Sequence, residues 1–342
     1  MSLHRLLLLA AVASLLAAPS VGQLALNADT PKLSSLAFGW VSMSGVDPTL
    51  DAMASFAPTM LGIREAGYSL GGEVATGTFS FSGFDVDSGW QSAQTNLGPG
   101  VLRLVHYRFN SNTAEVAGMQ LPPIVPPGTP PLLLNTFGDS VEVSYAQRIG
   151  TTGVGISLVP TDSATISVYQ GGATMATGKS KTDYGYRVGA VAPLKGAPNV
   201  RVGANFSYQK DESTLTPNAA HPLVVLSGAV PDTDRYITRA YTLGASSRLA
   251  PRTTVYGSYQ KIFGKGGSMD REAELIWFGV TQQLSDAVAV RANYLDGGLN
   301  VGLSCRTPIG LLIAAYTNKA LLNAKDVLGT GDSLFVGIDI AR

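Results

Sequence analysis

The sequence is poor in the residues on which soluble enzymes and nucleic-acid-binding proteins depend. Charged residues make up only 14% of the 342 residues, whereas an ordinary soluble domain carries about 25%. The 24 basic and 24 acidic residues balance, so the chain lacks the basic excess that a nucleic-acid partner requires. A single cysteine, Cys305, excludes an internal disulfide. The shortage of charge indicates that much of the surface does not face water.

A second absence concerns long hydrophobic runs. Beyond the N-terminus, no run of about 18 apolar residues occurs that could cross a bilayer as a helix. Only α-helices and closed β-barrels satisfy their backbone hydrogen bonds within lipid. Because the charge is low and no spanning helix is found, the sequence favours a closed β-barrel.

The N-terminus has the three-part layout of a secretory signal peptide. Met1–Arg5 is short and basic, Leu6–Ala18 is apolar, and Pro19–Gly22 ends the run with small residues near a cleavage point. The sequence therefore predicts a signal peptide over 1–22 and export of the remainder. Export of a barrel implies periplasmic chaperones and the barrel-assembly machinery as partners.

Alternation with a period of two dominates the exported chain. Between Val200 and Gln209, apolar Val, Ala, Phe and Tyr alternate with polar or small residues, and successive strand side chains point to opposite faces. Soluble strands average about 5–6 residues, but 235–249, 253–263 and 270–284 each run further without a break. Strands of this length suit a tilted membrane crossing.

Short Pro-, Asp-, Asn- and Gly-containing turns alternate along the chain with longer connections, as in outer-membrane barrels. We predict strands at 59–70, 74–86, 100–109, 139–149, 153–170, 182–193, 200–210, 235–249, 253–263, 270–284, 287–296, 298–306, 310–317 and 332–341. The predicted fold is all-β: a transmembrane antiparallel β-barrel of about 14 strands, with 12 to 16 compatible with the pattern, over 59–342. Pro160 predicts a bulge or a break in the strand 153–170.

Residues 23–58 precede the first predicted strand and do not alternate. The segment is predicted to be a plug inside the barrel or a periplasmic segment. A barrel of about 14 strands has room for such a plug, whereas side chains fill an eight-stranded one. The residues predicted to anchor the plug are Phe38, Trp40, Phe56 and Pro58.

The stretch from Asp51 to Leu61, ahead of about 14 strands, resembles the N-terminal hatch of FadL-type outer-membrane transporters of hydrophobic compounds. That family carries an Asn-Pro-Ala-type signature there; this chain has Phe56-Ala57-Pro58-Thr59, in which both the Asn and the Ala are replaced. The resemblance implies a plugged lumen and diffusive uptake of hydrophobic molecules.

The residues that face away from the apolar rows are the candidates for the lumen. A charge that faces lipid at mid-membrane costs about 2–4 kcal/mol, so charged residues on these strands are expected to face inward. They either fill and rigidify the barrel or line a selective path, and the sequence leaves both readings open. The lumen-lining candidates are Glu142, Arg148, Arg187, Arg201, Asn205, Arg291, Asn293, Arg306 and Asp339.

Catalysis is not predicted. Gly67–Gly71 matches the G-x-S-x-G nucleophile elbow, which needs a strand, a turn and then a helix, but alternating, strand-like sequence follows it. No His, Cys and acidic residues lie at metal-ligand spacing. We therefore expect neither a metal nor a cofactor.

The predicted function is an outer-membrane channel for passive uptake of small, hydrophobic molecules, with membrane lipid and a small solute as partners. The alternatives are a general porin for polar solutes and a closed structural or binding barrel that acts through its external loops. Conductance separates a channel from a closed barrel.

Overall fold

The computed structural model describes Leu61, Arg64 and Gly67 singly and then residues 69–81, 84–111, 114–115, 132–227, 230–266, 271–295, 298–308, 310–320 and 331–341. The predicted signal peptide and the segment 23–58 lie outside the described residues.

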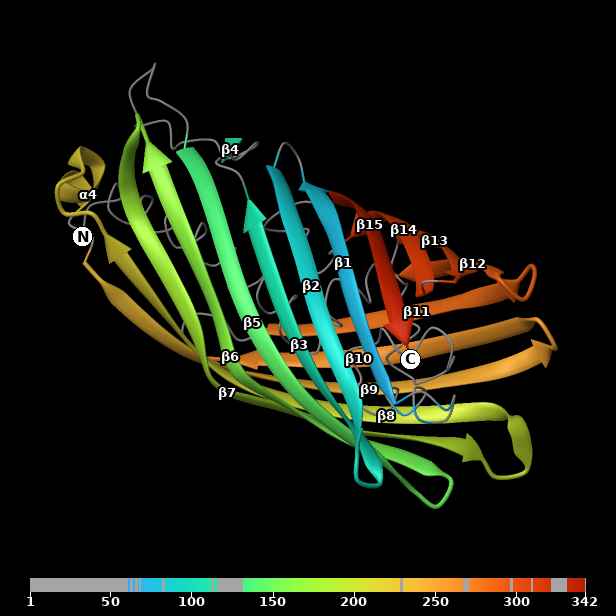
Figure 1. Ribbon diagram of the computed structural model, residues 1–342. Helices are drawn as coiled ribbons and strands as arrows, with labels where there is room; N and C mark the ends of the chain where they lie inside the picture. Colours follow the sequence, from blue (N-terminus) through green and yellow to red (C-terminus); the bar gives the residue numbers. More distant parts are fainter. Residues whose placement is uncertain are drawn as a thin grey trace.

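One antiparallel sheet accounts for nearly all of this chain and closes on itself (Figure 1). Its strands are β1 (Leu70–Phe81), β2 (Phe84–Leu97), β3 (Gly100–Ser111), β4 (Ala114–Glu115), β5 (Leu132–Ile149), β6 (Thr152–Gln170), β7 (Ala173–Leu194), β8 (Ala197–Pro217), β9 (Asp232–Ala250), β10 (Thr253–Lys265), β11 (Arg271–Gln283), β12 (Val288–Leu295), β13 (Gly298–Thr307), β14 (Gly310–Ala320) and β15 (Gly331–Ala341). The predicted all-β antiparallel barrel is confirmed.

The first and last strands pair with each other, with Gly71 opposite Ala341 and Phe81 opposite Gly331. β3 pairs with β5, and β4 adds only a two-residue ladder to β5. The fifteen strands of the sheet, less β4, therefore form a closed ring of fourteen. A closed ring leaves no strand edge with unpaired backbone groups.

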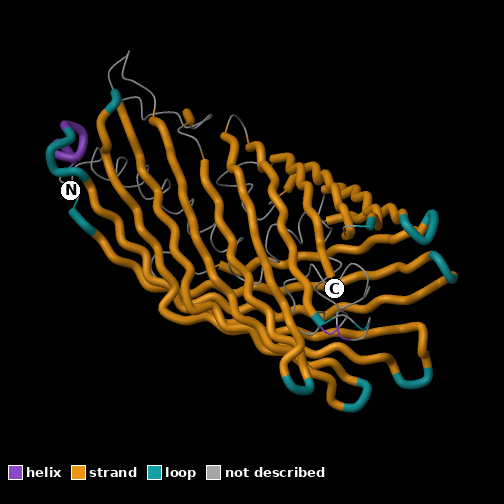
Figure 2. Tube along the Cα trace, viewed as in Figure 1, coloured by secondary structure: helices purple, strands orange, loops and turns teal. Residues whose placement is uncertain are grey.

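The two ends of the ring differ. Short turns join β2 to β3, β5 to β6, β7 to β8, β9 to β10, β11 to β12 and β13 to β14, and they gather at one end, the lower right in Figures 1 and 2. We call this the turn end. The opposite, loop end carries the helix α4 (Pro222–Ser227) between β8 and β9. No helix in the described ranges is long and apolar enough to span a membrane.

The predicted strand 59–70 is wrong, and the predicted strand 74–86 merges parts of two strands. Leu61 and Arg64 are helical, β1 begins at Leu70, and β1 and β2 are separate strands that end and begin at Phe81 and Phe84. Aromatic residues at Phe79, Phe81 and Phe84 lie on both sides of the Ser-Gly turn signal, so that the two strands read as one. β2 continues to Leu97 as Gln-, Ser- and Thr-rich sequence without the apolar row that identified other strands.

Strands β5, β7, β8 and β9 extend further towards the loop end than predicted. β7 begins at Ala173 because Gly171 and Gly172, with φ of 57° and 80°, form a two-residue turn that only glycine adopts freely. The added segments, such as Lys179–Lys181, carry polar residues outward. A strand that projects beyond lipid no longer needs an apolar row, so its sequence resembles a loop.

The predicted irregularity at Pro160 is confirmed. Between the pairs Val141–Thr161 and Val143–Leu158, β6 has one residue more than β5, which is a bulge next to Pro160. β7 bulges against β8 at Asp183. The bulges reverse which alternate residues face inward on the loop-end part of β6 and β7.

Candidate channel interior

The wall of the ring has two faces of opposite character. The face that we call the inner wall buries polar side chains, and the outer wall exposes apolar ones. The buried polar residues include Gln94, Arg103, Glu142, Ser144, Ser157, Arg187, Asn205, Ser207, Gln209, Thr242, Ser246, Gln260, Thr281, Arg291, Asn293, Asn300 and Ser304. The exposed apolar residues include Leu104, Ile156, Leu158, Val188, Val202, Leu243, Ile276, Phe278, Leu299, Val301, Leu303, Leu312, Leu334, Val336 and Ile340.

The apolar rows of the outer wall form a belt of limited height. On β8 the outward residues run from Val200 to Tyr208 and the next outward residue is Lys210; on β9 they end at Tyr241, before Arg239. A tilted membrane-spanning strand needs about 9–11 residues, which matches these rows. Aromatic residues at the edge of the belt are typical of the membrane interface.

A buried ion pair joins two of the predicted lumen residues. Arg187 Nη1 on β7 donates to Glu142 Oε2 on β5 at 3.1 Å. Ser144 Oγ donates to the other carboxylate oxygen at 2.9 Å and lies 2.8 Å from Ser157 Oγ. Glu142 is only 1% exposed, so the pair crosses β6 and ties three strands together from within.

Amides make similar links elsewhere. Asn293 Nδ2 on β12 donates to Asn300 Oδ1 on β13 at 2.8 Å, and both residues are buried. Gln260 Nε2 on β10 donates to Thr242 Oγ1 on β9 at 3.2 Å. Asn205 and Arg291 are also buried. These side chains stiffen the wall by cross-strand hydrogen bonds.

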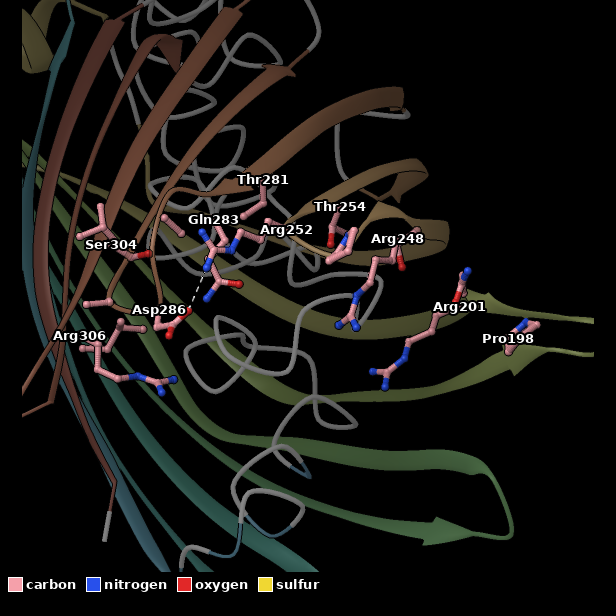
Figure 3. A pocket seen from close by; sticks show the side chains of 17 residues that line it. Pro198, Arg201, Arg248, Arg252, Thr254, Thr281, Gln283, Asp286, Ser304 and Arg306 are labelled. Carbon is pink, nitrogen blue, oxygen red and sulfur yellow. Dashed lines mark hydrogen bonds and ion pairs between the residues drawn. The ribbon is translucent and has the colours of Figure 1, made fainter.

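At the turn end the interior opens into a cavity of about 280 Å³. Four arginines from different elements line it: Arg201 on β8, Arg248 on β9, Arg252 in the β9–β10 turn and Arg306 on β13. Figure 3 shows Arg201, Arg248 and Arg306 extending from separate strands into the same region. The cavity lining includes one carboxylate, Asp286, which lies 3.4 Å from Arg252.

We call these four residues the arginine cluster. Arg201 and Arg306 were predicted to face inward, but Arg248 and Arg252 were not. Both faces of 235–249 carry mixed residues, so its inward face could not be assigned from sequence. Their position in the sequence could have identified them, because each of these arginines is close to a short turn and the short turns gather at one end of the barrel.

The inner wall also buries apolar side chains, which are interspersed with polar ones such as Arg103 on β3. β3 contributes Val101 and Val105, β6 contributes Val159 and Val168, and β7 contributes Met175, all buried. We call these five residues the apolar sector. Val101 packs with Leu61 and Ala146 in one buried cluster. The inner wall therefore contains buried apolar side chains as well as the cationic lining of the turn-end cavity.

Comparison with solved structures identifies this architecture. The toluene transporter TbuX of Ralstonia pickettii matches with a TM-score of 0.58 at 12% identity, over 90% of this chain and 97% of that one. The fold is that of the FadL-type transporters. A FadL homologue from Pseudomonas aeruginosa matches with a TM-score of 0.52 at 10% identity, over 90% and 97% of the two chains.

The monoaromatic hydrocarbon channel CymD matches with a TM-score of 0.54 at 10% identity, over 90% of this chain and 96% of that one. No protein-family model and no curated protein sequence matches the chain. Identities this low establish the FadL-type fold and leave the transported compound open.

The remaining predicted residues take varied places in the FadL-type barrel. Arg148 shares the inward register of Glu142 but is exposed near the turn end of β5. Asp339 lies on β15, where its backbone is opposite Glu73 of β1 and Leu311 of β14. The plug candidates, whose positions lie outside the described residues, are Phe38, Trp40, Phe56 and Pro58.

Beyond the apolar belt, towards the loop end, β8 carries a buried acid. Thr182 Oγ1 donates to Asp211 Oδ1 at 2.6 Å, and Gln209 Nε2 donates to the same atom at 2.9 Å. Burial raises the pKa of the Asp211 carboxyl to about 6, against the opposing effect of these two donors. In the part of the chain that is described, no cluster of three His, Cys, Asp or Glu residues could hold a metal ion.

Proposed function

We propose that the protein is an outer-membrane channel through which small hydrophobic molecules enter the cell by passive diffusion. The single observation that carries this proposal is the closed ring with an apolar outer belt and an interior that includes the apolar sector. The FadL-type fold, which the toluene and hydrocarbon channels share, supports it.

The apolar sector gives the proposal a testable path. Apolar solutes gain from apolar surface removed from water at about 25 cal/mol per Å², so the apolar sector is the part of the wall that retains them. Val168 faces inward on β6, and the adjacent Ser167 faces the other way. These neighbours provide a matched pair of substitutions on one strand.

Uptake of labelled toluene by cells without another channel for it tests the function. Cells that express the protein should take up the label faster than cells with an empty vector, and Val168→Asn should slow uptake while Ser167→Asn should not. Heat-modifiable migration on a gel checks that both variants fold. Equal uptake with and without the protein would contradict the proposal.

A general porin for polar solutes is the second candidate, and the arginine cluster favours it. A cationic mouth attracts anions from solution. In liposomes, a porin should admit small sugars and anions at rates that fall with solute size, whereas the proposed channel should exclude sugars. The same assay identifies a closed barrel, which should admit neither class of solute.

Residues 1–22 are proposed to be a signal peptide and 23–58 a plug at the turn end. The support is charge complementarity: the segment carries Asp29, Asp47 and Asp51 against Lys32, and the arginine cluster offers the opposite sign. Opposite charges within a few ångströms attract strongly where water is scarce. Deletion of 24–50 behind an intact signal peptide should raise ion conductance. Unchanged conductance from an assembled barrel would contradict the plug.

A further inference from the structure

The loop-end edge of the apolar belt is marked by stacked aromatic rings on β7, β8 and β9. The ring of Tyr208 lies 5.6 Å from that of Tyr184 and 5.5 Å from that of Tyr186, with interplanar angles of 15°. Phe206 lies 5.0 Å from Tyr241. These side chains share the outer wall with Val188, Val202 and Leu243, and they fix the level at which hydrocarbon gives way to headgroups.

Directly beyond these rings, the same three strands present an excess of basic residues on the outer wall. Five basic residues lie there against two acidic ones, Asp183 and Glu212. The five, which we call the basic patch, are Lys179, Lys181, Lys210, Arg235 and Arg239. Asp232 and Asp234 lie at the loop end of β9, and Asp234 is on the opposite face of the strand from Arg235.

The acids engage part of the basic patch and leave the rest available. Glu212 accepts from Arg235 at 3.0 Å and lies 3.4 Å from Lys181, and Lys210 lies 3.1 Å from Asp183. Arg239 packs over the ring of Tyr208 at 5.8 Å. Among the described residues, neither Lys179 nor Arg239 has an acidic partner. Arg235 and Lys181 remain 69% and 63% exposed on their side chains.

The excess of basic charge is local to this side of the ring. On β10 and β11 the outer wall carries Lys261 and Lys265 against Glu272 and Glu274, and Lys261 lies 3.3 and 3.1 Å from the two acids, so the signs balance. On β14 and β15, Tyr316 donates to Asp332 at 2.7 Å. A general solubilising rim would distribute both signs around the ring, so the concentration on β7–β9 indicates a specific anionic partner.

We propose that the basic patch binds the phosphate groups of an anionic lipid in the leaflet at the loop end. The acyl chains of such a lipid lie along Val188, Val202 and Leu243, and its headgroup phosphate then stands at the level of Lys210 and Arg239. Charge-assisted hydrogen bonds from Lys and Arg to phosphate are among the strong ones, and juxtamembrane basic residues attract anionic headgroups. A lipid fits better than a soluble anion because apolar and basic surfaces are continuous.

This proposal requires that the barrel span a membrane, as the proposed function does, but not that anything pass through it. Native mass spectrometry of the full chain in neutral detergent measures lipid binding without transport. The probes are a bis-phosphorylated glycolipid with several acyl chains and its dephosphorylated form. The wild-type protein should prefer the phosphorylated form.

The variant Lys179→Gln/Arg239→Gln removes two charges without leaving an acid unpaired. Its affinity for the phosphorylated glycolipid should fall about 10- to 30-fold, from the roughly 1 kcal/mol that each basic residue near a headgroup contributes. Lys179→Gln alone should give part of that loss while the contact of Arg239 with Tyr208 stays intact. Lys195→Gln, an equal charge change in the turn between β7 and β8, should change nothing.

Raising the salt concentration should weaken binding to the wild-type protein, because salt screens exposed charges. Equal affinity for both glycolipids, or wild-type affinity in the double variant, would overturn the proposal. Displacement of the glycolipid by equimolar inorganic phosphate would also overturn it, since the site would then recognise a free anion rather than a lipid. If the protein prefers the phosphorylated glycolipid but does not transport toluene, the proposed function is contradicted and the lipid-binding proposal is not.

Discussion

The outer and inner walls of this barrel are built from alternate residues of the same strands, yet they obey opposite rules. On β8, Val202 is 37% exposed while its neighbour Gly203 is buried. On β9, Leu243 is 61% exposed while Thr242 is buried. In a soluble barrel the apolar row would turn inward. The reversal shows that lipid, not water, is the solvent for which the outer wall is built.

The two walls also differ in variety. On most strands the outer wall presents aliphatic rows, with aromatic rings at the loop-end edge of the belt on β7, β8 and β9. The inner wall changes from place to place, with the Glu142–Arg187 pair, the arginine cluster at the turn end and the apolar sector on β3, β6 and β7. The outer wall meets one solvent, whereas the inner wall offers different surfaces at different levels of the barrel.

The largest expected effect comes from breaking the inner wall at its ion pair. Glu142→Gln leaves the guanidinium of Arg187 buried without its carboxylate, and removal of one partner of a buried pair costs about 3–5 kcal/mol. Urea unfolding in detergent, followed by heat-modifiable migration, measures the loss. Ser144→Ala, which keeps the ion pair, should cost much less. Equal stability of both variants would show that the pair contributes little.

A charge on the outer wall should have the next largest effect. Val202→Arg places a guanidinium in lipid at a cost of about 2–4 kcal/mol, whereas Gly203→Ser adds a hydroxyl to the inner wall. The fraction of heat-modifiable, membrane-inserted protein should fall for Val202→Arg and stay near the wild-type level for Gly203→Ser. The same yield from both variants would refute the assignment of the two faces.

The inner wall beyond the membrane should respond to pH through Asp211. Its pKa rises from 3.8 in the unfolded chain to about 6 because of burial, so the folded state loses stability as pH rises through that interval. From pH 5 to pH 7.5 the loss should be roughly 1 kcal/mol. Asp211→Asn keeps an acceptor for Thr182 and Gln209 and should flatten this dependence. If the thermal stability of Asp211→Asn depends on pH as strongly as that of the wild-type protein, the assignment of this pH dependence to Asp211 is contradicted.

The smallest effect is expected at the arginine cluster. Replacement of Arg201, Arg248 and Arg306 by Gln should shift the ion selectivity of the 24–50 deletion towards cations, because the mouth loses three positive charges. Reversal potentials in planar bilayers measure the shift, which should shrink at high salt. Lys195→Gln, outside the cavity lining, serves as the control. Unchanged selectivity would mean that ions do not pass the cluster.

Much of this architecture was predictable because lipid imposes a strict alternation on every crossing. The strand 200–210 lies within β8, and its apolar row is the exposed one. Prediction failed where lipid is absent. The segment 173–181 projects beyond the belt and carries no apolar row. Prediction also failed on β2, which presents Gln91 and Thr95 outward beside the exposed Val74 and Leu70 of β1.

The candidate site was less predictable than the fold. The alternation identifies which residues share a face, so Glu142 and Arg187 could both be assigned inward. It does not reveal that they meet across β6, because that contact depends on the register of three strands. Arg248 escaped prediction for a related reason, since the inward row of its strand is a mixture of Ala, Thr and Ser.

The assignment of the two walls is tested most directly by a spin-label scan along β8. In a Cys305→Ser background, single cysteines at positions 202 to 209 receive a nitroxide, and collisions with oxygen and with a water-soluble nickel complex are measured in liposomes. Positions 202, 204, 206 and 208 should collide mainly with oxygen, which concentrates in lipid, and positions 203, 205, 207 and 209 should not. Nickel collisions at the even positions, or no alternation at all, would contradict a lipid-facing outer wall.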